Sequence, residues 1–129
     1  QSITIPESVT KIGGHAFSGC SSLQSITIPE GVTEIGESAF SGCSSLQSIV
    51  IPKGVKKIEE FAFFDCTALT TVTLPVGVNK LHDTSFDECK ALTTIYVPAK
   101  KTDYYKQRLP EELHSLIVEL QPEKKAKKK

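Results

Sequence analysis

The sequence predicts a β-rich solenoid, in which coils of 23 residues stack on one another through parallel strands. Three observations predict it. The chain is self-similar at a period of 23 residues, proline recurs at one place in every coil, and all four cysteines occupy a single position of the repeat. A fixed period in the twenties is typical of repeat proteins, whose coils bury their apolar side only against the next coil.

The recurring positions are those expected to fill a core or to end a strand. They are Ile3, Ile26, Ile49, Val72 and Ile95; Pro6, Pro29, Pro52, Pro75 and Pro98; Phe17, Phe40, Phe63 and Phe86; Leu23, Leu46, Leu69 and Leu92; and Cys20, Cys43, Cys66 and Cys89. No coil could fold alone, because half of its apolar side chains have no partner until a neighbour stacks on them.

The second coil shows how each element is predicted. Residues 23–28 read Leu-Gln-Ser-Ile-Thr-Ile, an alternation typical of a short strand with one buried face. Pro29 lacks a backbone donor and ends that strand. Residues 32–35 predict a second, shorter strand. Residues 36–41 predict a tight turn, a single helical or 3₁₀ turn, with Phe40 in the core.

The period stops after the fifth strand, so we divide the chain into three parts. Residues 1–98 form the array, with four full coils and a fifth strand, and we expect it to lack an N-terminal cap. Residues 99–120 form a C-terminal cap, with Thr102 capping a short helix, a second helix after Pro110 and a last strand near 116–120. Residues 121–129 form a basic tail.

The cysteines are predicted to be free thiols. Because they recur every 23 residues, they stack in one file, one coil apart. Strands of neighbouring coils lie about 4.8 Å apart, whereas a disulfide needs Cβ atoms about 3.8 Å apart on converging bonds. A parallel file also cannot surround a metal ion tetrahedrally. We therefore expect buried thiols that act as small apolar groups, and no metal or cofactor is predicted.

Composition and motifs argue against an enzyme and against a membrane span. The net charge is zero, but residues 1–99 carry 6 lysines against 10 acids, and residues 100–129 carry 9 basic residues against 5 acids. No apolar run approaches the roughly 18 residues of a membrane span. No phosphate-binding loop, catalytic triad motif or metal-ligand spacing is present. The lysines of 121–129 leave binding to nucleic acid or an anionic membrane as an alternative.

The repeat unit L-x-x-I-x-I-P-x-x-V-x-x-I-x-x-x-A-F-x-x-C resembles the bacterial surface-antigen (BspA-like) family of leucine-rich repeats over residues 1–98. Residues 96–106 resemble the end of such arrays. The resemblance implies a leucine-rich-repeat solenoid with a parallel sheet on its concave side. It also implies a bacterial cell-surface or secreted protein for adhesion, whose partner is a host extracellular protein or another cell. A shared fold does not transfer a ligand.

The open face of the first strands carries the candidate ligand-binding residues. It is polar and nearly uncharged, and its hydroxyl and amide groups could bind a peptide backbone or the hydroxyls of a glycan. The same groups could also merely solvate a sheet. Tyr96 is the strongest candidate, because tyrosine is enriched at binding hot spots. The candidates are Gln24, Thr27, Gln47, Val50, Thr73 and Tyr96.

Phe61 and Phe64 form a second candidate surface, because they break the repeat at normally polar positions. Two large apolar residues there could form a contact patch or a dimer surface. They could equally fold onto each other or onto adjacent coils. The equivalent residues in the other coils are His15, Ser38 and Thr84, and Ser18, Ser41 and Asp87. The sequence thus predicts a non-enzymatic binding scaffold for a protein or a glycan.

Overall fold

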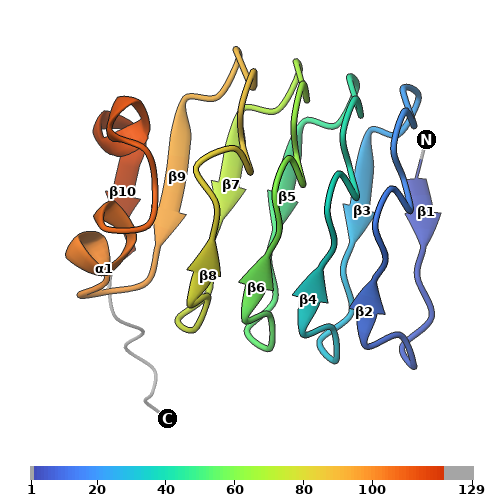
Figure 1. Cartoon of the computed structure of the whole chain (residues 1–129), viewed down its shortest axis with the longest axis horizontal. Helices are drawn as coiled ribbons and strands as arrows, with labels where there is room; N and C mark the ends of the chain where they lie inside the picture. The colour runs from blue at the N-terminus through green and yellow to red at the C-terminus, as the bar shows by residue number, and fades with distance from the viewer. Residues whose placement is uncertain (1, 121–129) are drawn as a thin grey trace, which may run out of the picture.

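The computed structural model describes residues 2–120, and over this range the chain forms a stack of coils, as predicted (Figure 1). The first strands of the coils line one side, here called the first sheet: β1 (Ser2–Thr4), β3 (Ser25–Thr27), β5 (Ser48–Val50), β7 (Thr71–Thr73), β9 (Thr94–Val97) and β10 (Ile117–Glu119). The second sheet, opposite, contains β2 (Lys11–Ile12), β4 (Glu34–Ile35), β6 (Lys57–Ile58) and β8 (Lys80–Leu81).

Strand pairing from β1 to β9 follows the sequence period. All pairs are parallel, and Ile49 lies opposite Val72, which lies opposite Ile95, 23 residues apart each time. The strand ladder of the first sheet is interrupted between β3 and β5, which leaves a two-stranded part (β1 and β3) and a four-stranded part (β5, β7, β9 and β10). A 3.3 Å hydrogen bond from the Gln47 N–H to the Gln24 carbonyl joins the two parts. Because the register equals the period, identical repeat positions stack into files that run along the molecule.

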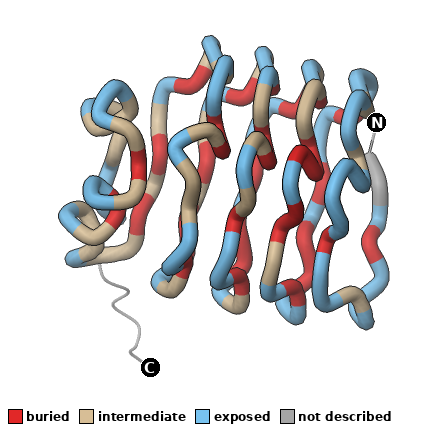
Figure 2. Tube along the Cα trace, viewed as in Figure 1, coloured by how far each residue is buried: buried red, intermediate tan, exposed pale blue. Residues whose placement is uncertain are grey.

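The core lies between the two sheets and is organised by stacked rings. Phe40 and Phe63 are fully buried, and their ring centroids lie 5.1 Å apart at an interplanar angle of 3°. Phe17 and Phe86 continue the stack at 5.2 and 5.3 Å. Figure 2 shows the buried segments inside the stack and a more exposed first coil, where Phe17 is only half-buried.

All four cysteines are free, as predicted. Cys43 and Cys66 are buried, and Cys20 and Cys89 are half-buried near the two ends of the file. Each thiol from the second coil on donates to the carbonyl of the preceding coil's phenylalanine: Cys43 Sγ to Phe17, Cys66 Sγ to Phe40 and Cys89 Sγ to Phe63, at 3.0–3.2 Å. The thiols therefore satisfy buried carbonyls as well as filling space.

A tight turn follows each second-sheet strand, as predicted, but it is not a regular 3₁₀ helix. Hydrogen bonds spanning three residues form there, such as Ala39 N–H to the Gly36 carbonyl at 3.1 Å. They do not build a 3₁₀ helix in residues 36–41, because Ser38 adopts a φ of 56° and interrupts the right-handed path. Gly36 itself has no room for a side chain, since a Cβ atom would lie 2.7 Å from the Gly14 nitrogen.

The segment after Pro98 packs on the last coil. It contains α1 (Thr102–Lys106), a 3₁₀ helix (Glu111–Leu116) and β10, which pairs with β9. Tyr105 is fully buried and its hydroxyl donates to the Pro75 carbonyl. The prediction that Thr102 caps α1 was wrong. Lys101 is the N-cap, and the Thr102 hydroxyl instead donates to a Glu119 carboxylate oxygen at 2.7 Å. The basic tail lies outside the described residues.

Candidate functional site

A stripe of exposed residues crosses the first sheet, and it contains the best of the sequence candidates. Strand register places Val50, Thr73, Tyr96 and Val118 in one file across β5, β7, β9 and β10. Val50 is 63% exposed and Val118 is 45% exposed, while Thr73 and Tyr96 are partly exposed. The file, here called the sheet stripe, presents apolar and aromatic groups on a rigid, hydrogen-bonded surface.

The other candidates on this face are exposed but lie away from the stripe. Gln24, Thr27 and Gln47 belong to the first half of the array, and all three are exposed. Some of the polar groups beside them hold the coils together. The Thr70 hydroxyl donates to the Gln47 carbonyl at 3.1 Å, and the Thr93 hydroxyl donates to the Thr70 carbonyl at 3.2 Å. Part of the polar face therefore stabilises the solenoid.

Two open grooves lie at the ends of the first-sheet strands. One, of about 530 Å³, brings together Val50 and Thr73 with the prolines that end β5 and β7, and its residues are Glu30, Val50, Ile51, Pro52, Lys53, Thr73, Leu74 and Pro75. The other, of about 360 Å³, includes Thr27. Val50 and Thr73 are thus the sequence candidates that share both the sheet stripe and a groove.

Phe61 and Phe64 lie on the turn side of the coils and pack against each other. Their ring centroids are 5.3 Å apart at 85°, an edge-to-face contact, and both side chains remain partly exposed. Phe61 adopts a φ of 60°, a left-handed conformation that is unusual for a bulky residue. The sequence could locate this pair, but it could not show that the two rings stay at the surface.

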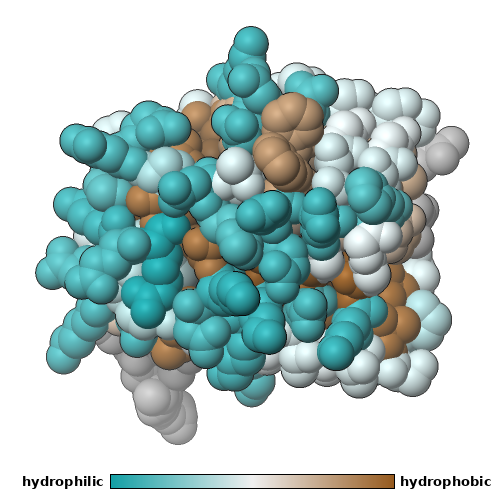
Figure 3. Space-filling model, viewed as in Figure 1, coloured by the Kyte–Doolittle hydropathy of each residue, from teal (hydrophilic) through white to brown (hydrophobic). Residues whose placement is uncertain are grey.

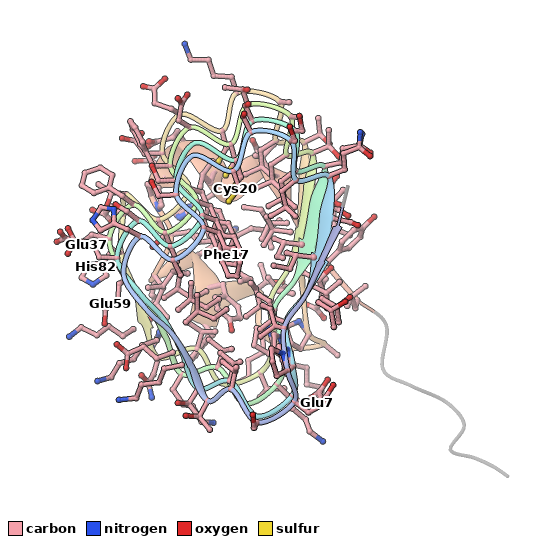
Figure 4. All side chains as sticks on the ribbon, turned by 90° about the vertical axis from the view of Figure 1, so that its right-hand side faces the viewer. Glu7, Phe17, Cys20, Glu37, Glu59 and His82 are labelled. Carbon is pink, nitrogen blue, oxygen red and sulfur yellow. The ribbon has the colours of Figure 1, made fainter. Side chains whose placement is uncertain are left out.

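The turns around this pair carry most of the array's carboxylates. Figure 4 shows Glu37, Glu59 and His82 together on the side opposite the first sheet. His82 Nε2 lies 3.3 Å from Glu59 Oε1, and its Nδ1 lies 3.8 Å from Glu60 Oε2, so a protonated imidazole would pair with both. Figure 3 shows hydrophilic side chains over most of this surface, with an apolar patch among them.

Cys43 and Cys66 are poor nucleophiles because of where they lie, whereas the hydrogen bond shared with Cys66 lowers the pKa of Cys89. Burial, together with the neighbouring Cys20, raises the pKa of Cys43 to about 11. The pKa of Cys66 is also raised, by a hydrogen bond with Cys89 and by burial. A thiol reacts as the thiolate, which these surroundings disfavour. Over residues 2–120, no three His, Cys, Asp or Glu side chains are placed to hold a metal ion.

Sequence reasoning missed the last residue of the sheet stripe and two other exposed apolar residues. Val118 lies opposite Tyr96 although the two are 22 residues apart, outside the repeat period. Leu120 and Val76 are also exposed, at 41% and 56%. The β-prone composition of residues 116–120 was a usable signal for a strand, but only the fold could supply its register.

Parallel coils, stacked cores and an exposed sheet define a repeat scaffold, and comparison with known proteins identifies the family. The family model of the BspA type leucine rich repeat region matches residues 1–108, with six copies of the repeat. The chain therefore belongs to this family of leucine-rich-repeat proteins, as the sequence predicted. Such repeats generally serve as scaffolds for protein interaction.

Solved structures of bacterial proteins share the fold. A leucine rich cell surface protein from Faecalibacterium prausnitzii is 30% identical, with a TM-score of 0.70, over 81% of this chain and 34% of that one. A leucine-rich repeat protein from Bacteroides ovatus is 26% identical, with a TM-score of 0.77, over 94% and 30%. A third, from Bacteroides capillosus, is 32% identical, with a TM-score of 0.66, over 74% and 75%.

The chain thus spans about a third of the first two of these proteins. No curated protein matches it. Among the described residues, no helix is long and apolar enough to cross a membrane.

Proposed function

We propose that this protein is a non-enzymatic adhesion module at a bacterial surface, and that it binds an extracellular protein through the sheet stripe. The observation that carries the proposal is the stripe itself, in which Val50 and Val118 are exposed on either side of Thr73 and Tyr96. Exposed apolar groups on a rigid surface are typical of protein-binding sites. The similarity to the leucine rich cell surface protein of F. prausnitzii supports the location.

The chemistry of the stripe favours a protein over a charged ligand. The file carries no charged side chain, and its tyrosine and valines offer apolar area with a polar hydroxyl at hand. Tyrosine loses little conformational entropy on binding, and it often contributes strongly to protein interfaces. A glycan is the second candidate, because exposed Gln24, Thr27 and Gln47 add amide and hydroxyl groups beside the stripe.

A variant that restores the repeat tests the proposal. Thr occupies the repeat position of Val50 and Tyr96 in the first, second and fourth coils, so Val50→Thr with Tyr96→Thr makes this file threonine from β1 to β9. The full chain would be immobilised and screened against purified extracellular-matrix proteins and a glycan array. We expect a matrix protein to bind, and the double variant to lose roughly tenfold or more in affinity, as for a hot spot.

The matched control is Asn79→Ala, an exposed uncharged position beside the second sheet. It should bind as the parent does, and circular dichroism should show that both variants are folded. Equal binding by the parent and the Val50/Tyr96 variant would contradict the proposal. Binding to glycans alone, lost in that variant, would favour the second candidate instead.

A further inference from the structure

The aromatic pair on the turns lies in the most acidic part of the described surface. We define the acidic ridge as the turn segments 36–45, 59–68 and 82–91, which contain seven carboxylates and one lysine, a net charge of −6 with histidine neutral. Lys90 lies 3.4 Å from Glu88, so its charge is partly neutralised within the ridge. The carboxylates are Glu37, Glu59, Glu60, Asp65, Asp83, Asp87 and Glu88, and all but Glu59 are exposed.

The fold does not require an aromatic pair here. The second coil has the same turn with Ser38 and Ser41 in place of Phe61 and Phe64, and Ser38 has nearly the same φ, 56° against 60°. A left-handed conformation is unfavourable for an ordinary residue, and it suits a bulky side chain least. His15 and Ser38 share this φ in the first and second coils, so the conformation belongs to the turn, and only the third coil places a bulky aromatic residue, Phe61, in it.

The geometry of the pair leaves aromatic surface for that partner. In an edge-to-face contact one ring presents its edge and the other a single face, so the remaining faces are free of the contact. Both rings are partly exposed. A ring face carries partial negative charge and attracts cations, and surrounding carboxylates reinforce that attraction.

The molecule already uses this chemistry at its other end. Two cations lie over the Tyr104 ring: Lys101, whose Nζ is 4.3 Å from the ring centroid, and Arg108, whose guanidinium carbon is 3.7 Å from it. At the acidic ridge the rings and the negative charges are present, but no cation of the described residues lies over either phenylalanine. A cationic side chain from a partner could therefore occupy the place that Lys101 and Arg108 occupy at Tyr104.

We propose that Phe61, Phe64 and the carboxylates of the acidic ridge form a docking site for a basic segment of a partner protein, with an arginine or lysine placed over an exposed ring. Charge complementarity identifies the partner's chemistry: a net charge of −6 repels acidic and nucleic-acid ligands and attracts a basic peptide. The site is separate from the sheet stripe, since the labelled ridge residues lie on the opposite side of the molecule (Figure 4). Either site can fail without the other.

The experiment uses the full chain and a fluorescent peptide of alternating arginine and glycine, with a glutamate–glycine peptide as the negative probe. Anisotropy would measure binding at low and at physiological salt. We expect the arginine peptide to bind, more weakly as salt screens the carboxylates. Phe61→Ser with Phe64→Ser, which copies the second coil, should weaken binding roughly tenfold, because a cation over an exposed ring contributes a few-fold in affinity for each ring.

Two further variants separate charge from aromatic contact. Asp65→Asn with Asp87→Asn removes two charges at constant shape and should reduce both the affinity and its salt dependence. Asn suits the left-handed conformation of Asp65, whose φ is 62°. Asn79→Ala, outside the ridge, should leave binding unchanged. Circular dichroism and melting would confirm that each variant is folded.

Three results would overturn the proposal. The first is no binding of the arginine peptide, and the second is equal binding by the parent and the Phe61/Phe64 variant, which would leave only unspecific charge attraction. The third is occupation of the ridge by the chain itself. A dimer of the parent that dissociates in the Phe61/Phe64 variant, or stronger peptide binding after deletion of the lysine-rich residues 121–129, would show it.

Discussion

The junction between the first and second coils and the junction between the third and fourth show how far the turns can diverge over one core. At the first junction, Gly36 packs directly on the backbone of the preceding coil, and the His15 N–H donates to the Glu37 carbonyl at 2.9 Å. At the second, Glu59 and His82 take the repeat position of Gly36, and their side chains contact each other at the surface.

The backbone hydrogen bonds between neighbouring turns also change at the junction between the third and fourth coils. The Ser38 N–H donates to the Glu60 carbonyl at 3.0 Å, but among residues 2–120 the equivalent bond from the Phe61 N–H to the Asp83 carbonyl is not formed. The Ser85 hydroxyl instead reaches the Glu59 carbonyl at 3.1 Å, from a position where the second and third coils have alanine. Within the described part of the chain, the buried Thr84 hydroxyl has no hydrogen-bond partner.

The spacing of the core rings is nearly the same at both junctions. The ring spacing is 5.2 Å between Phe17 and Phe40, and 5.3 Å between Phe63 and Phe86. Stacking of the buried files therefore holds the coils at one distance, whatever the turns carry. The exposed positions of the turns can therefore carry an aromatic pair and a cluster of carboxylates without changing the spacing of the core.

The largest predicted effect tests whether the two junctions share one core. Phe40→Ala and Phe63→Ala should each lower the free energy of unfolding by about 3–5 kcal/mol, because both rings are fully buried between two others. Urea unfolding followed by circular dichroism measures the loss. Phe17→Ala, at a half-buried ring, is the control and should cost less. Variants of Phe40 and Phe63 that melt within a few degrees of the parent would refute the common core.

The next prediction separates the junctions at their turns. Gly36→Ala should destabilise the protein by about 1–3 kcal/mol, because the new Cβ would lie 2.7–2.8 Å from backbone atoms of residues 12–14. Glu59→Ala, at the same repeat position, should cost less than about 1 kcal/mol, since it removes only a partly exposed contact to His82. Thermal melts of both variants provide the measurement. Equal losses would mean that the third coil is packed as tightly as the second.

The sequence could predict which residues stack in files, but not the pairing of the last strand or the path of the turns. The period of 23 specified the register, the Phe stack and the free cysteines, because each follows from identical residues meeting one coil apart. It could not predict the sheet stripe's last member, since Val118 pairs with Tyr96 at a spacing of 22. Nor could it predict that Phe61 and Phe64 stay at the surface, because the path of a turn depends on φ values that a repeat pattern does not contain.

A third prediction concerns the segment that covers the last coil. The buried Tyr105 hydroxyl donates to the Pro75 carbonyl, and Tyr105→Phe would leave that carbonyl without its partner. We expect a loss of about 1–2 kcal/mol in the free energy of unfolding. Tyr104→Phe is the matched control: its hydroxyl bonds the Val78 carbonyl at 2.8 Å, but in a partly exposed place where water can substitute. A larger loss for Tyr104→Phe would contradict the interpretation that the buried Tyr105 hydroxyl contributes more to stability.

The smallest effect concerns pH and the buried thiol file. Burial, followed by the charge of Cys20, raises the pKa of Cys43 from 9.0 to about 11 in the folded protein. Above about pH 9 the unfolded chain releases this proton while the folded chain retains it, so the unfolded state binds fewer protons and stability falls until about pH 11. The contribution is fully present below pH 9.

Cys43→Ala removes this dependence, whereas titrations of the lysines and tyrosines remain common to parent and variant. The stability difference between parent and Cys43→Ala should therefore shrink as the pH rises from about 8 to about 10.5, when urea midpoints are compared at each pH. The change should be smaller than the loss expected for Phe40→Ala, because it comes from a single ionisation and leaves the packing of the core intact. A difference that stays constant over this range would show that the Cys43 thiol ionises equally in both states, and that its bond to the Phe17 carbonyl does not hold the proton.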